Sequence, residues 1–138
     1  MLFRSPNTLK GYIGNVNADI LAHRYEYLKE PEILPDISIL SVPDIIAMKL
    51  NAISTSGQRS KDFIDIFYLL KYYNVGDMIE FYRKKYRQEH VAHVLKSLVY
   101  FDDIDLSDWP VIIENPRLKW SIVKKQIEKS VLDFCKDA

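Results

Sequence analysis

The hydrophobic pattern of this chain changes abruptly at Ser41, and that change constrains the fold more than any other feature. Upstream, the segment VNADI (16–20) alternates apolar and polar residues with the period of two that is typical of a half-buried strand. ISIL (37–40) is a second short candidate strand, and the turn signal Pro35-Asp36 precedes it. From Ser41 onward the apolar residues recur at helical spacing. The pattern therefore predicts strands first and helices afterwards.

Start and stop signals divide the second part of the chain into helices. SVPD (41–44) is typical of a helix start, because it places a serine at the N-cap, a proline in the first turn and an acid near the positive end of the helix dipole. We expect this helix to run to about Ile53. The next should begin with Ser60 as its N-cap and end by Asn74 or Gly76, residues that tolerate a C-cap conformation.

Three further helices complete the predicted fold. They are expected at residues 78–87, 90–99 and 118–134. The fold class is therefore α+β and predominantly helical, with a small strand pair followed by about five helices. With 138 residues, 48% of them hydrophobic, the chain is large enough to bury one core. We expect a single domain over 1–138, with a strand region at 1–40 and a helical region at 41–138.

Composition narrows the functional classes only slightly. The 19 basic and 19 acidic residues cancel, so no overall charge favours nucleic acid or a membrane surface, and any such attraction must be local. No apolar run approaches the roughly 20 residues that span a bilayer, and we expect no membrane segment. A single cysteine, Cys135, and an N-terminus without an apolar signal region favour a cytoplasmic protein.

Lys49 lies in the middle of the apolar face of the first predicted helix. Ile46, Leu50 and Ile53 share its arc when the helix is drawn at 100° per residue. One interpretation is a lysine whose stem packs while its ammonium reaches water. The other is an ammonium at the edge of a cleft, where it meets a carboxylate or a phosphate. An unpaired buried ammonium would cost several kcal/mol, so the second interpretation requires such a partner.

The second predicted helix carries a narrow polar stripe on an otherwise apolar surface. Asp62 is explained by the helix dipole, because it lies in the first turn. Asp65 lies beyond that turn, and Lys61 precedes it by four residues in the less favourable order for an ion pair. A solvent-facing stripe is one explanation. A polar cleft that Lys49 also faces explains the stripe better.

A basic stretch, FYRKKYRQ (81–88), is the one local charge cluster that could contact RNA. Its four basic side chains spread over much of the helix circumference instead of forming one stripe. We therefore expect a solvated helix surface there.

Several of these segments together resemble the AbiEii/AbiGii toxin family of nucleotidyltransferases, which are similar in fold to the polymerase beta superfamily. The resemblance lies in LSVPDIIAMKLNAI (40–53), then Arg59, then KDFIDIFYLL (61–70). It extends upstream to VNADI and downstream to HVLKSLVYFDDID (93–105) and the tryptophan-containing last helix, so it covers nearly the whole chain.

The resemblance implies a set of site residues and ligands. Catalytic roles fall on Asp19, Asp62 and Asp65, nucleotide binding on Lys49, Arg59 and Lys61, and metal binding on Asp19. Such residues suit nucleotidyl transfer, because carboxylates hold divalent ions, cations stabilise phosphate charge and an acid accepts the proton of the attacking hydroxyl. The implied cofactor is magnesium. The implied partners are a nucleoside triphosphate, an RNA or protein acceptor, and an antitoxin or a second copy, as in bacterial toxin–antitoxin pairs.

The chain departs from the family pattern near its start. Family members carry an Asp-x-Asp pair early in the sequence, whereas no acid precedes Asp19 here. We therefore expect a shortened member, a member completed by another polypeptide, or a fold retained for another task. A further explanation is that the start of the chain is misassigned or has been removed. The alternative function is a noncatalytic, partner-binding remnant whose site residues form a structural ion-pair network. An edge left unpaired at VNADI would favour a dimer or another partner.

Overall fold

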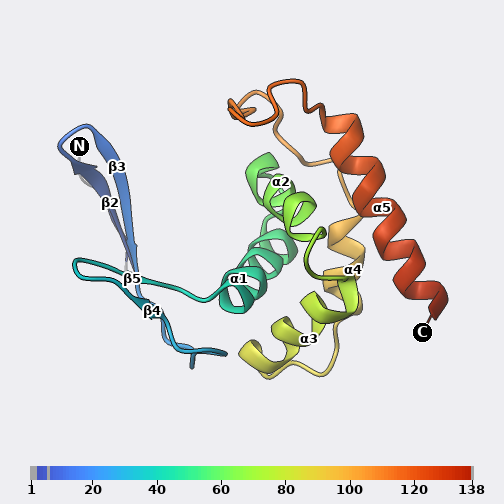
Figure 1. The fold of residues 1–138 in the computed structure, drawn as a ribbon, viewed down its shortest axis with the longest axis horizontal. Helices are drawn as coiled ribbons and strands as arrows, with labels where there is room; N and C mark the ends of the chain where they lie inside the picture. The colour runs from blue at the N-terminus through green and yellow to red at the C-terminus, as the bar shows by residue number, and fades with distance from the viewer. Residues whose placement is uncertain (1–2, 6, 138) are drawn as a thin grey trace.

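The computed structural model describes residues 3–5 and 7–137 of the chain, and within them it contains five strands followed by five helices (Figure 1). The strands are β1 (Phe3–Ser5), β2 (Thr8–Ile13), β3 (Val16–Leu21), β4 (Glu32–Ile33) and β5 (Ser38–Ile39). The helices are α1 (Val42–Thr55), α2 (Ser60–Leu69), α3 (Val75–Tyr86), α4 (Ala92–Leu98) and α5 (Trp120–Asp137). The predicted α+β, mostly helical class is confirmed.

The strands form two small antiparallel sheets. β1, β2 and β3 pair in that order, and a tight turn in which Gly14 has a φ of +60° joins β2 to β3. β4 and β5 form a separate hairpin, so the predicted strand at 37–40 is shorter than expected. The segment VNADI lies in β3, at the edge of its sheet. Large apolar side chains are exposed there, with Val16 67% and Ile20 60% accessible.

The predicted start of α1 is confirmed. The Ser41 hydroxyl accepts a hydrogen bond from the backbone N–H of Asp44 at 3.2 Å, which satisfies one of the free donors of the first turn. The helix then ends near Gly57, whose φ of +65° suits glycine.

The predicted bounds of α2 are partly wrong. Its N-cap is Arg59, and Ser60 is already helical. The helix ends at Leu69, short of Asn74, because the Asn74 side chain caps the next helix. Asn74 and Asp77 form a capping box, so the asparagine that looked like a stop signal is a start signal.

The core lies around α1 and α2. Ile46 and Leu50 on α1 and Phe63 on α2 are fully buried, and α1 packs against α2, α3 and α4. Phe63 also meets Phe101 and Trp120 edge-on, with ring centroids 5.8 and 5.9 Å away, which joins α2 to the start of α5. Within residues 3–5 and 7–137, no helix is both long and apolar enough to cross a membrane.

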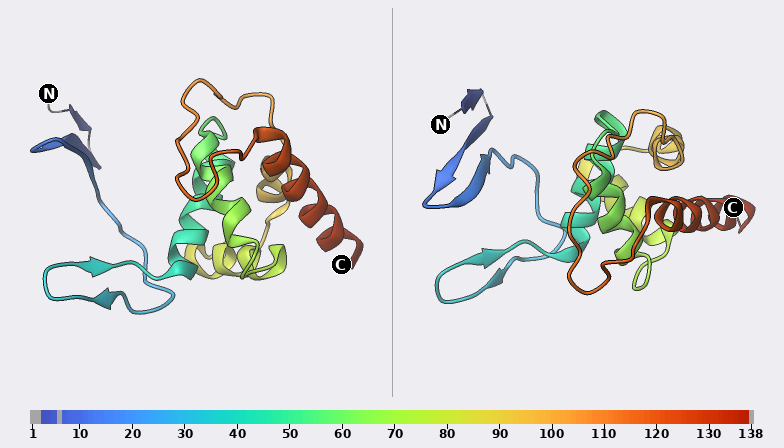
Figure 2. Two further views of the ribbon diagram at one scale, coloured as in Figure 1. Left: turned by 45° about the horizontal axis from the view of Figure 1, so that its top comes forward. Right: turned by 90° about the horizontal axis from the view of Figure 1, so that it is seen from above.

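Both hairpins lie on the side of α1 opposite α5 and extend away from the helices (Figures 1 and 2). Residues 22–31, the connecting segment between β3 and β4, contact the helices through hydrogen bonds to Asp44 of α1 and Lys85 of α3. That connection matters for function, because it forms one wall of a groove along α1.

Candidate functional site

A groove of about 770 Å³ runs along α1, between this helix and the end of the β2–β3 hairpin. Side chains from α1, the start of α2, the strand ends and the end of α3 surround it. They are Thr8, Leu21, Ala22, His23, Tyr25, Leu40, Ile45, Met48, Lys49, Asn51, Ala52, Thr55, Arg59, Asp62 and Tyr86. Three of the six site residues predicted from the resemblance, Lys49, Arg59 and Asp62, are among them.

Lys49 is the centre of an ion-pair network at this groove. Its Nζ lies 2.9 Å from Asp62 Oδ1 and 2.7 Å from Asp65 Oδ2. Burial alone would lower the pKa of Lys49, but hydrogen bonds to Asp65 and Asp62 outweigh it, and the pKa is raised. The lysine is therefore charged. An ammonium has three N–H donors, so one remains beyond the two that these acids accept.

The two acids of the network differ in exposure. They are three residues apart on α2, which puts them on one face of the helix. The Asp62 side chain is 6% exposed and that of Asp65 is 48% exposed. Asp62 lines the groove and Asp65 does not. Asp62 therefore pairs with Lys49 on the buried side of the network, whereas the Asp65 carboxylate pairs with it on the side that faces solvent.

Lys61 lies apart from the groove. Its ammonium pairs with Asp108 at 3.1 Å, in a smaller pocket of about 150 Å³ that Arg59 also lines. Arg59 therefore stands between the two pockets. The loop that carries Asp108 is held there because Asp105 N donates to Gln58 O at 2.9 Å. The structure thus does not bring Lys61 together with Lys49.

Asp19 lies on β3, outside the residues that line the groove. It is paired in register with Lys10, whose Nζ lies 4.0 Å from Asp19 Oδ2. Side chains two residues apart share a face of a strand, so Asp19 shares its face with Leu21, which does line the groove. Asp19 is therefore one step along the hairpin from the groove.

A second ion pair, Asp44 with Lys85, is the main feature that sequence reasoning missed. Both side chains are completely buried, and Lys85 Nζ lies 2.5 Å from Asp44 Oδ1. The prediction of a solvated surface for FYRKKYRQ is thus wrong for Lys85. A signal was present, because Lys85 follows Met78 and Tyr82 at helical spacing, and both of those are buried.

Asp44 also fastens the connecting segment to α1. Its carboxylate accepts from the backbone N–H of Leu28 at 2.9 Å and of Lys29 at 3.2 Å, and from the Ser41 hydroxyl. Burial alone would raise the pKa of Asp44. The hydrogen bonds, that of Lys85 first, outweigh it and lower the pKa from 3.8 to about 2. The helix-dipole role predicted for Asp44 is therefore the smaller part of its function.

A magnesium site requires several oxygen ligands close together. Within the described part of the chain, no three His, Cys, Asp or Glu side chains gather closely enough to hold a metal ion. Asp62 and Asp65 are already bound to the Lys49 ammonium. These residues by themselves therefore do not fit a magnesium site.

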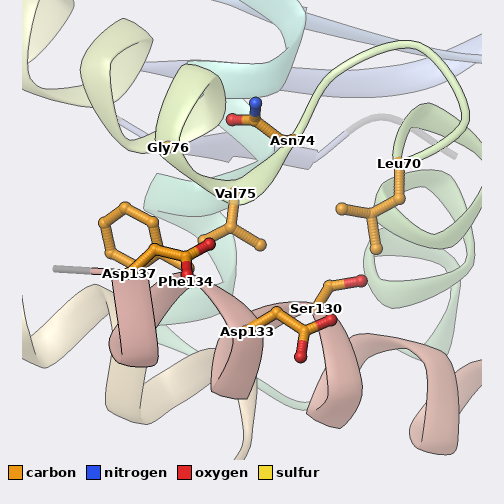
Figure 3. Close-up of a pocket in the computed structure, with 8 residues that line it drawn as sticks. All are labelled: Leu70, Asn74, Val75, Gly76, Ser130, Asp133, Phe134 and Asp137. Atoms are coloured by element: carbon orange, nitrogen blue, oxygen red, sulfur yellow. The ribbon is translucent and has the colours of Figure 1, made fainter.

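Another pocket, of about 400 Å³, lies between the start of α3 and the C-terminal half of α5 (Figure 3). Figure 3 shows Asp133, Asp137 and Phe134 projecting from α5 below Val75 and Gly76. None of the residues that line it is basic, and the Asp133 carboxylate pairs with Lys129. This pocket is therefore unsuited to a phosphate, and the groove along α1 is the better candidate.

Comparison with known proteins identifies the family of this chain. Residues 15–136 match the family described as nucleotidyl transferase AbiEii toxin, type IV toxin–antitoxin system. An uncharacterized protein of Aquifex aeolicus (strain VF5) is 28% identical over 137 residues, which cover 96% of this chain and 64% of that protein. The chain thus spans somewhat less than two-thirds of this relative. No solved structure matches the chain. The chain belongs to the AbiEii nucleotidyl transferase toxin family.

Proposed function

We propose that the groove along α1 binds a nucleoside triphosphate and forms part of a nucleotidyl transfer site. One observation carries this proposal: Lys49, with an N–H donor to spare, lines the same groove as Arg59. Phosphate oxygens accept hydrogen bonds from both kinds of side chain, and the guanidinium offers a planar pair of donors. Nucleotidyltransferase-like function in general follows from the family.

The charges of the groove suit an anionic ligand. Lys49 and Arg59 each contribute one positive charge and Asp62 one negative charge, so the lining side chains carry a net charge of about +1 when His23 is neutral. Asp62 fixes the position of the Lys49 ammonium. A cation held in place by a buried carboxylate reaches a phosphate without losing side-chain entropy on binding.

The remaining site residues enter the proposal with different roles. Asp65, half-exposed beside Lys49, would accept the proton of an attacking hydroxyl. Asp19, on the hairpin face that continues the groove wall, is the acid that would contribute to a magnesium site. The further ligands for that ion would come from outside the described residues. Lys61 would act only at the second pocket, on a group that extends past Arg59.

The acceptor and the partners are also proposals. The toxin–antitoxin family supports an antitoxin as partner. An RNA or protein acceptor for the nucleotide is part of the proposal and rests on the resemblance of the sequence alone. The exposed apolar residues of β3, at an unpaired sheet edge, offer a surface to an antitoxin or to a second copy of this chain. Light scattering that found only monomers over a wide concentration range would count against the second copy.

The Lys49 network also favours one competing function. Two carboxylates already satisfy most of the Lys49 ammonium, as expected of a structural ion-pair network in a noncatalytic, partner-binding protein. In that case the groove would be part of a binding surface, and no triphosphate would bind with useful affinity.

Calorimetric titration with each nucleoside triphosphate, with and without magnesium, separates the two functions. We expect saturable binding that Lys49→Met weakens by at least about tenfold, because a charge-assisted hydrogen bond to phosphate is lost. Lys129→Met is the matched control, since Lys129 is an exposed, acid-paired lysine on α5. If no triphosphate binds at millimolar concentration, the proposal is wrong and the noncatalytic function is favoured.

A further inference from the structure

The groove along α1 has two chemically different ends. Arg59 and Asp62 lie at the end where α1 gives way to α2, and His23, Tyr25 and Tyr86 lie where α1 begins. The lining residues of α1 run from Ile45 to Thr55, which lie ten steps apart along the helix, or about 15 Å. A ligand that follows the groove thus meets charged groups at one end and aromatic rings at the other.

His23 is held in one tautomer at the aromatic end. Lys85 Nζ lies 2.5 Å from Asp44 Oδ1, 3.1 Å from His23 Nε2 and 3.3 Å from the carbonyl oxygen of Glu26. An ammonium has three donors and no acceptor, so Nε2 must accept. The His23 ring is therefore neutral and carries its proton on Nδ1. Among the described residues, no hydrogen bond occupies that Nδ1–H.

The charges around His23 keep the ring neutral. Burial lowers the pKa of His23, the Lys85 ammonium lowers it further, and Asp44 on the far side of Lys85 raises it by less. The rings that meet His23 are Tyr25 and Tyr27, at centroid distances of 6.0 and 5.8 Å. A second proton on His23 would face the Lys85 ammonium at hydrogen-bond distance.

We propose that the aromatic end of the groove binds the base of a nucleotide, and that His23 donates from Nδ1 to an acceptor on the base edge. The proposal rests on the proposed function, since it requires a nucleotide in the groove. Tyr25 supplies an aromatic surface, because the residue is 51% exposed while Tyr86 meets its ring edge-on, with the ring centroids 4.7 Å apart. Bases stack on such rings, and a fixed donor beside them distinguishes one base from another.

Nitrogen NMR of the wild-type chain tests the tautomer directly. We expect His23 to show a protonated Nδ1 and an unprotonated Nε2 at neutral pH, and to gain a second proton only below the ordinary histidine pKa of 6.5. A His23 ring protonated on Nε2, or one with a pKa at or above 6.5, would overturn the proposal.

Binding measurements with paired variants test the base site. The probes are the four nucleoside triphosphates and inorganic tripolyphosphate, which has no base. We expect His23→Phe to reduce the preference between the best and worst triphosphates by about tenfold or less, the range of one lost hydrogen bond, and to leave tripolyphosphate affinity unchanged. His23→Gln should restore much of the preference, because its amide can accept from Lys85 and donate to the base. His90→Gln is the matched control.

The outcomes separate this inference from the proposed function. If triphosphates and tripolyphosphate bind equally well, or if His23→Phe leaves base preference unchanged, the base site is wrong while phosphate binding stands. If neither kind of probe binds, the proposed function fails, and unphosphorylated adenosine, guanosine, cytidine and uridine are titrated next. Nucleosides that shift the His23 Nδ1 signal would support the base site on its own, and the absence of any shift would overturn it. Thermal melting of each variant confirms that the fold is intact.

Discussion

Helix α1 carries two lysine–aspartate clusters five residues apart, and they are built in opposite ways. At Asp44, the carboxylate and the Lys85 ammonium are completely buried, and every Lys85 donor has an acceptor. At Lys49, the lysine side chain is 26% exposed, and that of Asp65, one of its two acids, is 48% exposed. The first cluster is closed and the second is open.

The difference separates architecture from function. A closed cluster cannot take a ligand without breaking its own bonds, and its bonds fix the connecting segment, through Leu28 and Lys29, against α1. That segment carries His23 and Tyr25 and so forms a wall of the groove. The open cluster faces the space that results. We therefore expect changes to the closed cluster to affect folding, and changes to the open one to affect binding.

Removal of Lys85 should have the largest effect on stability. Lys85→Met leaves the Asp44 carboxylate buried without its cation, and losses of this kind cost about 3 to 5 kcal/mol in the free energy of unfolding. Urea denaturation measures the change. The double variant Asp44→Asn with Lys85→Met should recover part of the loss, because no charge is then buried. A loss below about 1 kcal/mol in the single variant would mean that the pair is not closed in solution.

Protonation of Asp44 at low pH should have the second largest effect on stability. The pKa of Asp44 is about 2 in the folded chain, whereas an aspartate without these partners has a pKa of 3.8. Folding therefore favours the deprotonated form. The stability from this group is therefore present above about pH 4 and is lost as pH falls toward 2. It amounts to at most roughly 2 to 3 kcal/mol, from 1.36 kcal/mol per pKa unit. Urea denaturation between pH 5 and 2 should show a steeper loss in wild type than in Asp44→Asn, and equal slopes would contradict this prediction.

The local half of this architecture was predictable from the sequence. The Ser41 cap, the β3 segment and the succession of helices follow from residues close together in the chain. Helical spacing also indicated that Lys49, Asp62 and Asp65 face a common space, and the structure brings the three side chains together. Short-range periodicity is enough to decide which face of a helix a residue occupies.

The long-range half was not predictable in the same way. Lys85 meets Asp44 across 41 residues and His23 across 62, and which face of α3 meets α1 depends on how the helices pack. The groove has the same origin, since its walls come from strand ends, the length of α1, the start of α2 and the end of α3. Asn74 shows a local limit as well, because one residue type serves as helix stop and as N-cap.

At the open cluster, Lys49→Met should have a smaller effect on stability than either change at the closed one. The methionine keeps the apolar stem, and water can reach Asp62 once the ammonium is gone, so we expect a loss of about 1 kcal/mol. Thermal melting and urea denaturation measure it beside the tenfold loss of triphosphate affinity expected above. A loss as large as that of Lys85→Met, without any effect on ligand binding, would place Lys49 with the architecture.

Lys61→Met should have the smallest effect of these variants on stability, although Lys61 is one of the predicted site residues. The Lys61 side chain is 44% exposed and its partner Asp108 is 81% exposed, and exposed pairs of this kind contribute about 0 to 1 kcal/mol. We expect a change in the free energy of unfolding of less than about 0.5 kcal/mol. Triphosphate affinity should fall much less than in Lys49→Met, because Lys61 lies outside the groove. If calorimetry finds equal losses in the two variants, the triphosphate extends past Arg59 into the second pocket, and the binding site is longer than the groove along α1.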